Sequence, residues 1–549
     1  MATNYADDEQ INESGGYSGD VSEITKAGRI RVTTINRKEA PLAETNLKAL
    51  VEVTGAEIGR DRLGADIVTV LDVTDMDDDS LQKLNQIKIA MKFLINKLSP
   101  IDRLSVITVS RASTTRNSPL LQMTESSKRK VENLVNDLKL VDESNNSFNE
   151  TTDGAQNCSL QTALQVLNGR TLKAGRVPAI MLVICNCEPK FDAENTDINV
   201  PVYTFGLGPK YDEKVLNEIS MKSMGGTFSI ADVQNKPTYS NLSAAFLQCL
   251  AGLLTVVVQD LKLIIKSTVN SKIHKVSAGK YSKLKNEDDD MDTKTVSFAN
   301  LYCKEKRRVM VDLQLEPVDS EEVEDVLEIT YSYKIGDISF EERTPLCATI
   351  KRTKTTFEQE AEEVTIEAAR LRTVEVIEKA IQLADNGEFD EAQDIIVEAQ
   401  NKLEDDVDEP KESLEILKYE LYKLIQFMQS KETYKSFGHA FALASHTSHD
   451  SQRVAARGDL KSNPPMFTTP LMDKFVKQLI AFDKNNSMVG LPSIVDDLEQ
   501  EIANNPIAAF AGALSFHVEK LIQTLKIMQD KVNIFHQVGV EGFKSSVSR

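Results

Sequence analysis

The residues best suited to chemistry follow a short apolar run near the start of the chain. Ile67–Leu71 is β-branched and has the length of a strand buried on both faces, and Asp72 follows it directly. A carboxylate there lies where a parallel strand delivers ligands. The next turn contains Asp75 and Asp77–Asp79, which favours the amino end of a following helix. From Leu81 onward apolar residues recur every three or four positions, so the sequence predicts strand, acidic turn and helix.

No catalytic motif accompanies this carboxylate. The sequence has no phosphate-binding loop, no G-x-S-x-G turn, and no Cys or Ser that it pairs with a His. His439, His446 and His449 cluster only in a polar stretch, and we interpret them as exposed surface histidines. The six scattered cysteines lack zinc-site spacing and are typical of buried free thiols in a reducing cytosol. These patterns favour a binding protein over an enzyme.

The charge balance limits the class of partner. Acidic residues outnumber basic ones by 84 to 64, and the net charge of -20 opposes nonspecific binding to nucleic acid or anionic lipid. No stretch approaches the roughly 20 apolar residues that would span a bilayer. Residues 1–27 have no apolar signal-peptide core and are expected to form a disordered acidic tail. We therefore expect a cytoplasmic protein with protein partners, no nucleic acid and no transmembrane segment.

Residues 65–257 alternate apolar strands with amphipathic helices. This alternation predicts a doubly wound, mostly parallel sheet covered by helices on both faces. In such sheets, ligands bind beyond the carboxyl ends of the strands. Asp72, the loop after Val141 and the loop after Cys185 are therefore expected to surround one crevice.

Residues 258–354 change to a period of two, broken by polar loops, which predicts an antiparallel β-sandwich. Residues 28–64 contain two further strand-like runs that have no partner within the α/β segment. We expect these strands to join the sandwich, so that the α/β domain is inserted into it.

The rest of the chain is predicted to be helical. Within residues 355–460, one helix should end at Asn386-Gly387 and another begin at Phe389, a hairpin that resembles a single tetratricopeptide unit. Such a hairpin either packs against its neighbours or offers a peptide groove. Residues 461–505 contain Asn463-Pro464-Pro465 and are expected to be a linker with short helices.

Residues 506–549 form a tail with a heptad pattern, in which apolar residues step by four and three positions. Over three heptads this seam predicts either a coiled coil between two chains, and so a homodimer through the tail helix, or an intramolecular bundle. The members of the seam are Leu514, Val518, Leu521, Leu525, Met528, Val532 and Phe535.

The α/β segment resembles a von Willebrand factor type A domain. The stretch DIVTVLDVTDM occupies the place of the family strand ending in D-x-S-x-S, and LSVITVS, AIMLVICNC, PVYTFGLG and GGTFSIAD follow in the order of that fold. Over residues 28–475 the chain is similar to the plant RING-type E3 ubiquitin ligases of the wavy-growth group, as Leu247–Leu254 and Ala456–Asp459 indicate. The resemblance implies a Rossmann-like fold and a role in protein binding.

The resemblance also implies a metal-ion-dependent adhesion site, which is degenerate here. In the family, Mg2+ is held by an aspartate, two serines, a threonine and a second aspartate, and an acidic group of the partner completes its shell. Asp72 is kept and Thr74 replaces the first serine, but Met76, Gln156 and Asn186 stand at the other three positions. A thioether is a poor ligand for Mg2+, so no cofactor beyond weakly bound Mg2+ is expected.

The acidic and polar residues around this position are candidates for partner contacts. Asp75, Asp77 and Asn157 are expected at the partner-binding crevice, and an inward turn of either aspartate would add charge to the metal position. The sequence Arg457-Gly458-Asp459 is expected to be a helix end rather than an adhesion motif.

The family's RING lies before the type A domain and needs eight Cys or His zinc ligands. Residues 1–64 contain neither residue type, so this chain is not expected to ligate ubiquitin alone. We expect a non-catalytic scaffold that binds other proteins at the crevice without metal. Two alternatives stay open: a RING-less partner or regulator of a ubiquitin E3 ligase complex, and a Mg-dependent adhesion protein like the inter-alpha-trypsin inhibitor heavy chains.

Overall fold

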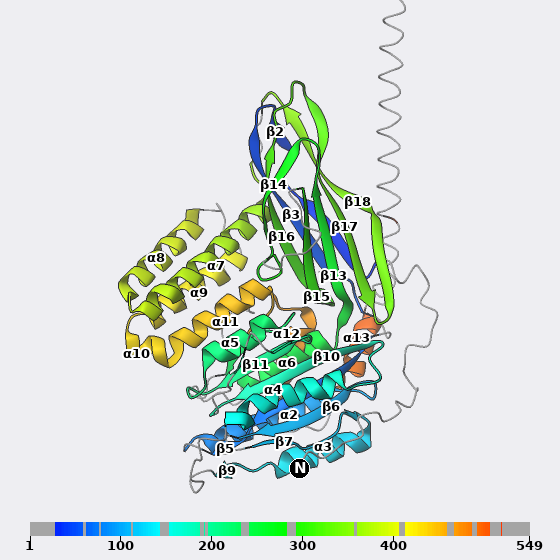
Figure 1. The fold of residues 1–549 in the computed structure, drawn as a ribbon, viewed down its shortest axis with the longest axis vertical. Coiled ribbons are helices and arrows are strands. Elements are labelled where there is room, and N and C mark those ends of the chain that lie inside the picture. Colours follow the sequence, from blue (N-terminus) through cyan, green and yellow to red (C-terminus); the bar gives the residue numbers. More distant parts are fainter. Residues whose placement is uncertain are drawn as a thin grey trace, which may run out of the picture.

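Three structural units build the protein. The computed structural model places an α/β domain at one end, a β-sandwich extending away from it, and a group of helices beside both (Figure 1). It describes residues 28–504 and Val518, apart from residues 59–61, 76–77, 111–112, 143–152, 187–190, 193–195, 232–240, 283–291, 356–358, 406–411, 458–465 and 486–490.

The α/β domain is built on a sheet with the strand order β12-β11-β10-β4-β6-β7. Its central strand is β4 (Gly64–Asp72), which is buried throughout. The neighbours from β12 to β6 run parallel, whereas β7 and β8 pair antiparallel with β6. These strands are β6 (Arg103–Val109), β7 (Thr114–Arg116), β8 (Leu121–Gln122), β10 (Arg176–Ile184), β11 (Val202–Leu207) and β12 (Phe228–Ala231). Beyond β4, the short strands β5 (Thr74–Asp75) and β9 (Val141–Asp142) pair in parallel.

Helices cover both faces of this sheet, because alternate residues of β4 point to opposite sides. Ile67 and Leu71 belong to the core that includes α2 and α6, whereas Val68 and Val70 pack in a second core with α4 and α5. The helices are α2 (Ser80–Lys97), α3 (Glu125–Asp137), α4 (Asp153–Asn168), α5 (Glu213–Lys222) and α6 (Asn241–Leu253).

The β-sandwich consists of two sheets, with the orders β1-β3-β16-β14 and β15-β13-β17-β18-β2. Strand β3 (Thr45–Gly55) pairs antiparallel with β16 (Lys306–Leu315) from Thr45 to Thr54. Since β3 precedes the α/β domain and β16 follows it, the α/β domain is inserted into the sandwich. The other strands are β1 (Ile30–Ile35), β2 (Glu39–Pro41), β13 (Val256–Ser267), β14 (Ser271–Ser277), β15 (Thr293–Tyr302), β17 (Glu322–Ile335) and β18 (Ile338–Thr353).

The helical hairpin has the boundaries that the sequence predicts. Helix α7 (Glu362–Asn386) ends at Gly387, whose φ of 89° is a left-handed conformation that glycine adopts without strain, and α8 (Phe389–Asp405) follows. Helix α9 (Glu412–Phe427) packs against both through a shared apolar core. Then come α10 (Lys431–Thr433), the π-helix η2 (Tyr434–Gly438) and α11 (His439–Ser451). The hairpin thus buries its apolar face against its neighbours.

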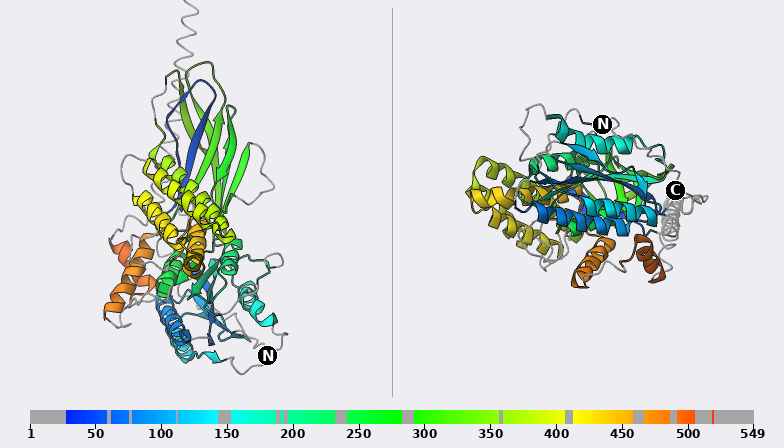
Figure 2. Two further views of the ribbon diagram at one scale, coloured as in Figure 1. Left: turned by 90° about the vertical axis from the view of Figure 1, so that its left-hand side faces the viewer. Right: turned by 90° about the horizontal axis from the view of Figure 1, so that it is seen from below.

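The expected linker contains two packed helices. Helices α12 (Pro470–Asn485) and α13 (Ile494–Asn504) lie against the α/β domain, in orange in Figure 2, where α12 packs on α6. Phe475 is buried in the same core as α6, and Asp497 pairs with Lys97 of α2 at 2.7 Å with both side chains buried. The segment is therefore part of the fold, because the apolar face of α12 packs on α6. In the sequence, polar residues on either side of the helix obscure this apolar face.

Helix α11 lies between the other units, so the prediction of exposed histidines is wrong: His439 and His449 are buried, and His446 is half-buried. His449 is fully buried, and its Nε2 lies 3.0 Å from Glu420 Oε2 of α9. His439 is also buried, and its Nδ1 lies 2.7 Å from Glu213 Oε1 of α5. The polar composition of this segment reflects buried hydrogen bonds between units rather than exposure to solvent.

Beyond α11 the chain runs along the edge of β12. Ile230 N–H donates to Ala456 O, and Arg457 forms a parallel β-bridge with Ile230. Arg457 is therefore in an edge contact and not at a helix end, which corrects the expectation for that residue. Its guanidinium pairs with the buried Glu420 carboxylate, so Glu420 links α9, α11 and the edge segment.

Two sequence predictions fall outside the described residues. One is the disordered tail at residues 1–27. The other is the heptad seam, in which Val518 alone is described, as an exposed helical residue. Of the helices that the structure describes, none has the length and apolar character needed to cross a membrane.

The Glu420 cluster predicts a loss of stability in acid. Burial alone would raise the pKa of Glu420, but Arg457 and His449 lower it to about 2, whereas burial lowers the pKa of His449. Both groups therefore bind protons more readily in the unfolded chain than in the folded one. Their contribution to the free energy of unfolding is complete above about pH 6.5 and decreases as the pH falls toward about 2. We expect urea unfolding midpoints to decline over this range. Glu420→Gln should cost about 3 kcal/mol at pH 7 and flatten the decline, and an unchanged pH profile would contradict this account.

Candidate functional site

The candidate site lies at the carboxyl end of the central strands of the α/β domain. Asp72 is the last residue of β4, and Cys185 and Asn186 come directly after β10, which pairs in parallel with β4. Parallel neighbours end at the same edge, so the sheet brings these three residues together. Thr74 follows in β5. Asp72, Thr74 and Asn186 are therefore adjacent, as expected for the crevice.

The Asp72 carboxylate is buried and accepts three main-chain hydrogen bonds. Its Oδ1 accepts from Thr74 N–H at 3.0 Å, and its Oδ2 accepts from Cys185 N–H at 2.9 Å and from Asn186 N–H at 2.7 Å. These donors satisfy the acceptor oxygens of a carboxylate that water does not reach. Asp72 thus joins the turn after β4 to the end of β10.

The Asn186 side chain is bonded at both ends of its amide. Its Nδ2 donates to Thr74 O at 3.0 Å and to Ser80 Oγ at 3.2 Å, and its Oδ1 accepts from Lys83 Nζ at 3.0 Å. Lys83 comes from the first turn of α2 and is buried, as Ser80 is. Three segments therefore meet at one amide: the β4–β5 turn, the start of α2 and the end of β10.

These residues do not fit the Mg2+ site of the resemblance. The described positions offer a single carboxylate, Asp72, and it already accepts three main-chain donors. Asn186 is neutral, and the oxygen that would face the ion accepts from an ammonium group, whose charge would repel Mg2+. Asp75 is exposed and does not turn inward. Among the described residues, no three His, Cys, Asp or Glu side chains come together in a way that would hold a metal ion.

Several predicted residues lie outside the described part of the chain. Met76, Asp77 and the side chains of Gln156 and Asn157 belong to this group, although α4 includes the last two. The same holds for the loop after Asp142. Their places around the crevice stay predictions.

Lys83 and Ser80 are site residues that sequence reasoning missed. The signal was available, because Lys83 falls in the stripe of α2 that continues through Ile87, Ala90 and Leu94, all buried. A lysine in an apolar stripe needs a buried acceptor or anion.

A conservative change at Asp72 tests the geometry of the crevice. Asp72→Asn keeps the shape but turns an NH2 group toward main-chain donors, so we expect the protein to lose about 3 kcal/mol of stability in urea unfolding. Asp75→Asn changes an exposed carboxylate in the same turn and should stay within about 0.5 kcal/mol. Equal stability of Asp72→Asn and the unmodified chain would rule out the hydrogen-bond pattern described above.

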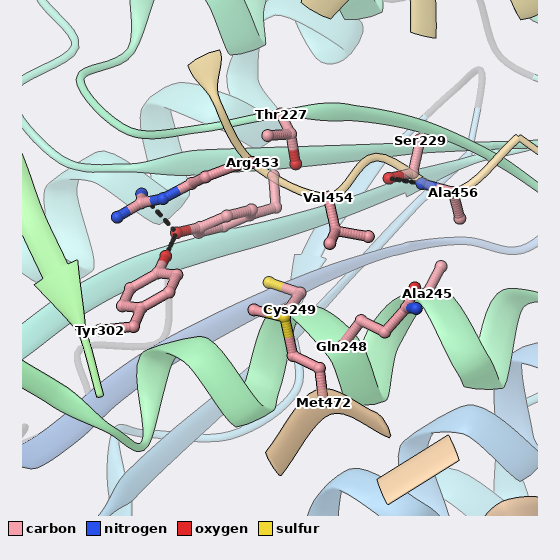
Figure 3. A pocket seen from close by; sticks show the side chains of 11 residues that line it. Thr227, Ser229, Ala245, Gln248, Cys249, Tyr302, Arg453, Val454, Ala456 and Met472 are labelled. Atoms are coloured by element: carbon pink, nitrogen blue, oxygen red, sulfur yellow. Dashed lines mark hydrogen bonds between the residues drawn. The ribbon is translucent and has the colours of Figure 1, made fainter. Parts of the chain in front are cut away.

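A second candidate is a cavity where the three units meet. It is lined by Tyr203, Thr227, Ser229, Ala245, Gln248, Cys249, Tyr302, Arg453, Val454, Ala456 and Met472 (Figure 3). Its volume of about 20 Å3 is room for one water molecule. Burial raises the pKa of the Cys249 thiol well above its usual value, so the thiol stays protonated. The cavity is too small for a substrate, and its one thiol is not activated.

Arg453 makes this junction a structural joint. Its guanidinium donates to Glu305 Oε1 at 3.0 Å and to Asn300 O at 2.7 Å in the sandwich, and to Gly225 O at 2.6 Å in the α/β domain. It also lies 4.0 Å from the centre of the Tyr302 ring. One buried cation thus fixes the sandwich to the α/β domain.

The fold has known counterparts. A von Willebrand factor type A protein from Catenulispora acidiphila superposes with a TM-score of 0.56 at 14% sequence identity, covering 77% of this chain and 97% of that one. The ArnB paralog VWA2 from Sulfolobus acidocaldarius has a TM-score of 0.45 at 13% identity, with 77% and 98% coverage. The superposition on the Catenulispora protein shows that the chain has the type A domain fold that its sequence resembles.

Sequence comparison leads to a plant relative. The E3 ubiquitin-protein ligase WAV3 of Arabidopsis thaliana is 27% identical over 255 residues, which are 46% of this chain. They are 31% of that protein, so the chain matches about a third of its relative's length. A family model described as VWA / Hh protein intein-like matches residues 411–481, the segment from α9 to α12.

Proposed function

We propose that this protein is a non-catalytic scaffold that binds other proteins at the crevice of its type A domain without a metal ion. The observation that carries the proposal is the bonding of Asp72, Thr74 and Asn186 to one another and to Lys83. The three described positions that would hold Mg2+ in the family are held together by protein donors. A crevice closed in this way has no place for the carboxylate of a partner on a metal.

The rim of the crevice offers other contacts. Leu81, in the first turn of α2, is 62% exposed, and Asp75, Asp78 and Asp79 beside it are exposed. A partner that binds at this rim would cover the Leu81 side chain, which is a large apolar group. The buried Arg453 fixes the sandwich to the α/β domain, so the rim is presented on a rigid body.

The relative supports a second candidate, a partner or regulator of a ubiquitin E3 ligase complex. WAV3 is an E3 ubiquitin-protein ligase, and the similarity covers only part of it. A protein that is similar to part of an E3 ligase would bind some of the proteins that the ligase binds. Under this candidate the chain acts with a RING supplied by another chain, and self-association through the heptad tail would add a second contact.

The scaffold proposal predicts partner capture that does not depend on Mg2+. We expect the full chain to recover the same proteins from a cell extract in 5 mM EDTA and in about 5 mM Mg2+. Leu81→Glu should abolish the capture, because a charge at the rim opposes burial of that surface. Val269→Glu is the matched control, since Val269 is an apolar residue of the sandwich that is 97% exposed. Capture only in Mg2+, or capture unaffected by Leu81→Glu, would argue against the proposal.

A further inference from the structure

We propose that the ammonium group of Lys83 is a built-in cation that stands in for the divalent ion of this fold. The inference deepens the proposed function and rests on it, because it explains how the crevice keeps its form without metal. It assigns Lys83 a positioning role: the lysine ties the start of α2 to Asn186 at the end of β10 and does not contact the partner.

The first step is the place of the ammonium. Lys83 Nζ lies 3.0 Å from Asn186 Oδ1, and Lys83 is 1% exposed. By the resemblance, residue 186 takes the place of the aspartate from the third loop, whose carboxylate faces the ion. The positive charge is therefore bonded to the atom that would otherwise point at Mg2+.

The second step is the balance of charge. Asp72 is a buried carboxylate, and a buried ionised group is costly unless donors and an opposite charge accompany it. Main-chain N–H groups supply donors, and one of them belongs to Asn186. The same residue accepts from Lys83, so one amino acid connects the buried anion with the buried cation. The charges of Lys83 and Asp72 offset each other.

The third step is what Asn186 gains from being neutral. An aspartate there would place a second carboxylate near Asp72 and would lack a side-chain NH2 group. Asparagine keeps an oxygen for Lys83 and adds an NH2 group that donates to Thr74 O and Ser80 Oγ. The loss of the acidic residue and the use of the lysine thus belong to one arrangement.

The consequence concerns regulation. A cation on a helix cannot be removed by a chelator and presents no open coordination position to a partner. Binding at the crevice should then be insensitive to Mg2+ concentration, and the rim of the crevice should have the same form with and without the partner.

Paired substitutions test the inference, with Mn2+ as the probe and the electron paramagnetic resonance signal of free Mn2+ as the readout. The unmodified chain and Asn186→Asp should not bind Mn2+, because Lys83 pairs with the new carboxylate. Lys83→Met/Asn186→Asp removes the ammonium and leaves two carboxylates, and it should bind Mn2+ at least about tenfold tighter than Asn186→Asp alone. Its thermal midpoint should rise when Mn2+ is added.

Lys97→Met/Asn186→Asp is the matched control, because Lys97 is a second buried lysine of α2 that pairs with Asp497 away from the crevice. It should not create Mn2+ binding. If the double variant does not fold, Lys83→Gln/Asn186→Asp offers a less drastic change, and Lys83→Arg, which keeps the charge, should stay folded without metal.

Two results would overturn the inference. A folded double variant that does not bind Mn2+ would show that the ammonium does not occupy the cation position. Mn2+ binding by Asn186→Asp as tight as that of the double variant would show the same. Either result leaves the scaffold proposal standing if the unmodified chain still binds no Mn2+, whereas Mn2+ binding by the unmodified chain would undermine the scaffold proposal itself.

Discussion

The structure of the crevice depends on one constraint, the burial of the Asp72 carboxylate at the end of the central strand. A carboxylate in that place must be compensated, and type A domains of the resembled family use a divalent ion. Here main-chain N–H groups from two loops converge on Asp72, and Asn186 relays the contact to Lys83. These hydrogen bonds hold the turn after β4 and the end of β10 together without a metal ion. A binding surface with fixed loops loses little conformational entropy when a partner binds.

A second set of buried charged residues joins the α/β domain, the sandwich and the helices. Arg453 donates hydrogen bonds to both the sandwich and the α/β domain. Glu420 pairs with His449 and Arg457, which lie on the segment between the units. All four residues lie within the segment that the VWA / Hh protein intein-like model matches. This segment is helical at its start and runs along the edge of β12 at Arg457, so its helices and its edge contact together join the units. A scaffold that presents a crevice at a fixed angle requires such a joint.

Local sequence patterns predict most of the helices and strands. The features that they do not predict depend on contacts between residues far apart in the sequence. The apolar run Ile67–Leu71 and the glycine at 387 are local signals, which is why the sequence predicts the central strand and the α7–α8 turn. Burial of His449 depends on Glu420, which is distant in sequence, and no local pattern records that pairing.

The candidate site shows the same division. Asp72 and Asn186 were found from their positions after predicted strands. The apolar stripe of α2 marks Lys83 as a lysine that needs a buried acceptor, but no local pattern identifies that acceptor, which lies on another loop more than a hundred residues along the chain. The packing of α12 on α6 was obscured for a related reason, since an amphipathic helix between polar loops resembles a linker until its partner is known.

The measurement that tests the central claim most directly is a calorimetric titration of the full chain with Mg2+, beside the Asp72→Ala variant. The account predicts no saturable heat for either protein at millimolar Mg2+, because Lys83 and the main-chain donors already satisfy the crevice. Saturable binding by the unmodified chain that disappears in Asp72→Ala would contradict it. That result would return Mg2+, and the carboxylate of a partner, to the centre of the mechanism.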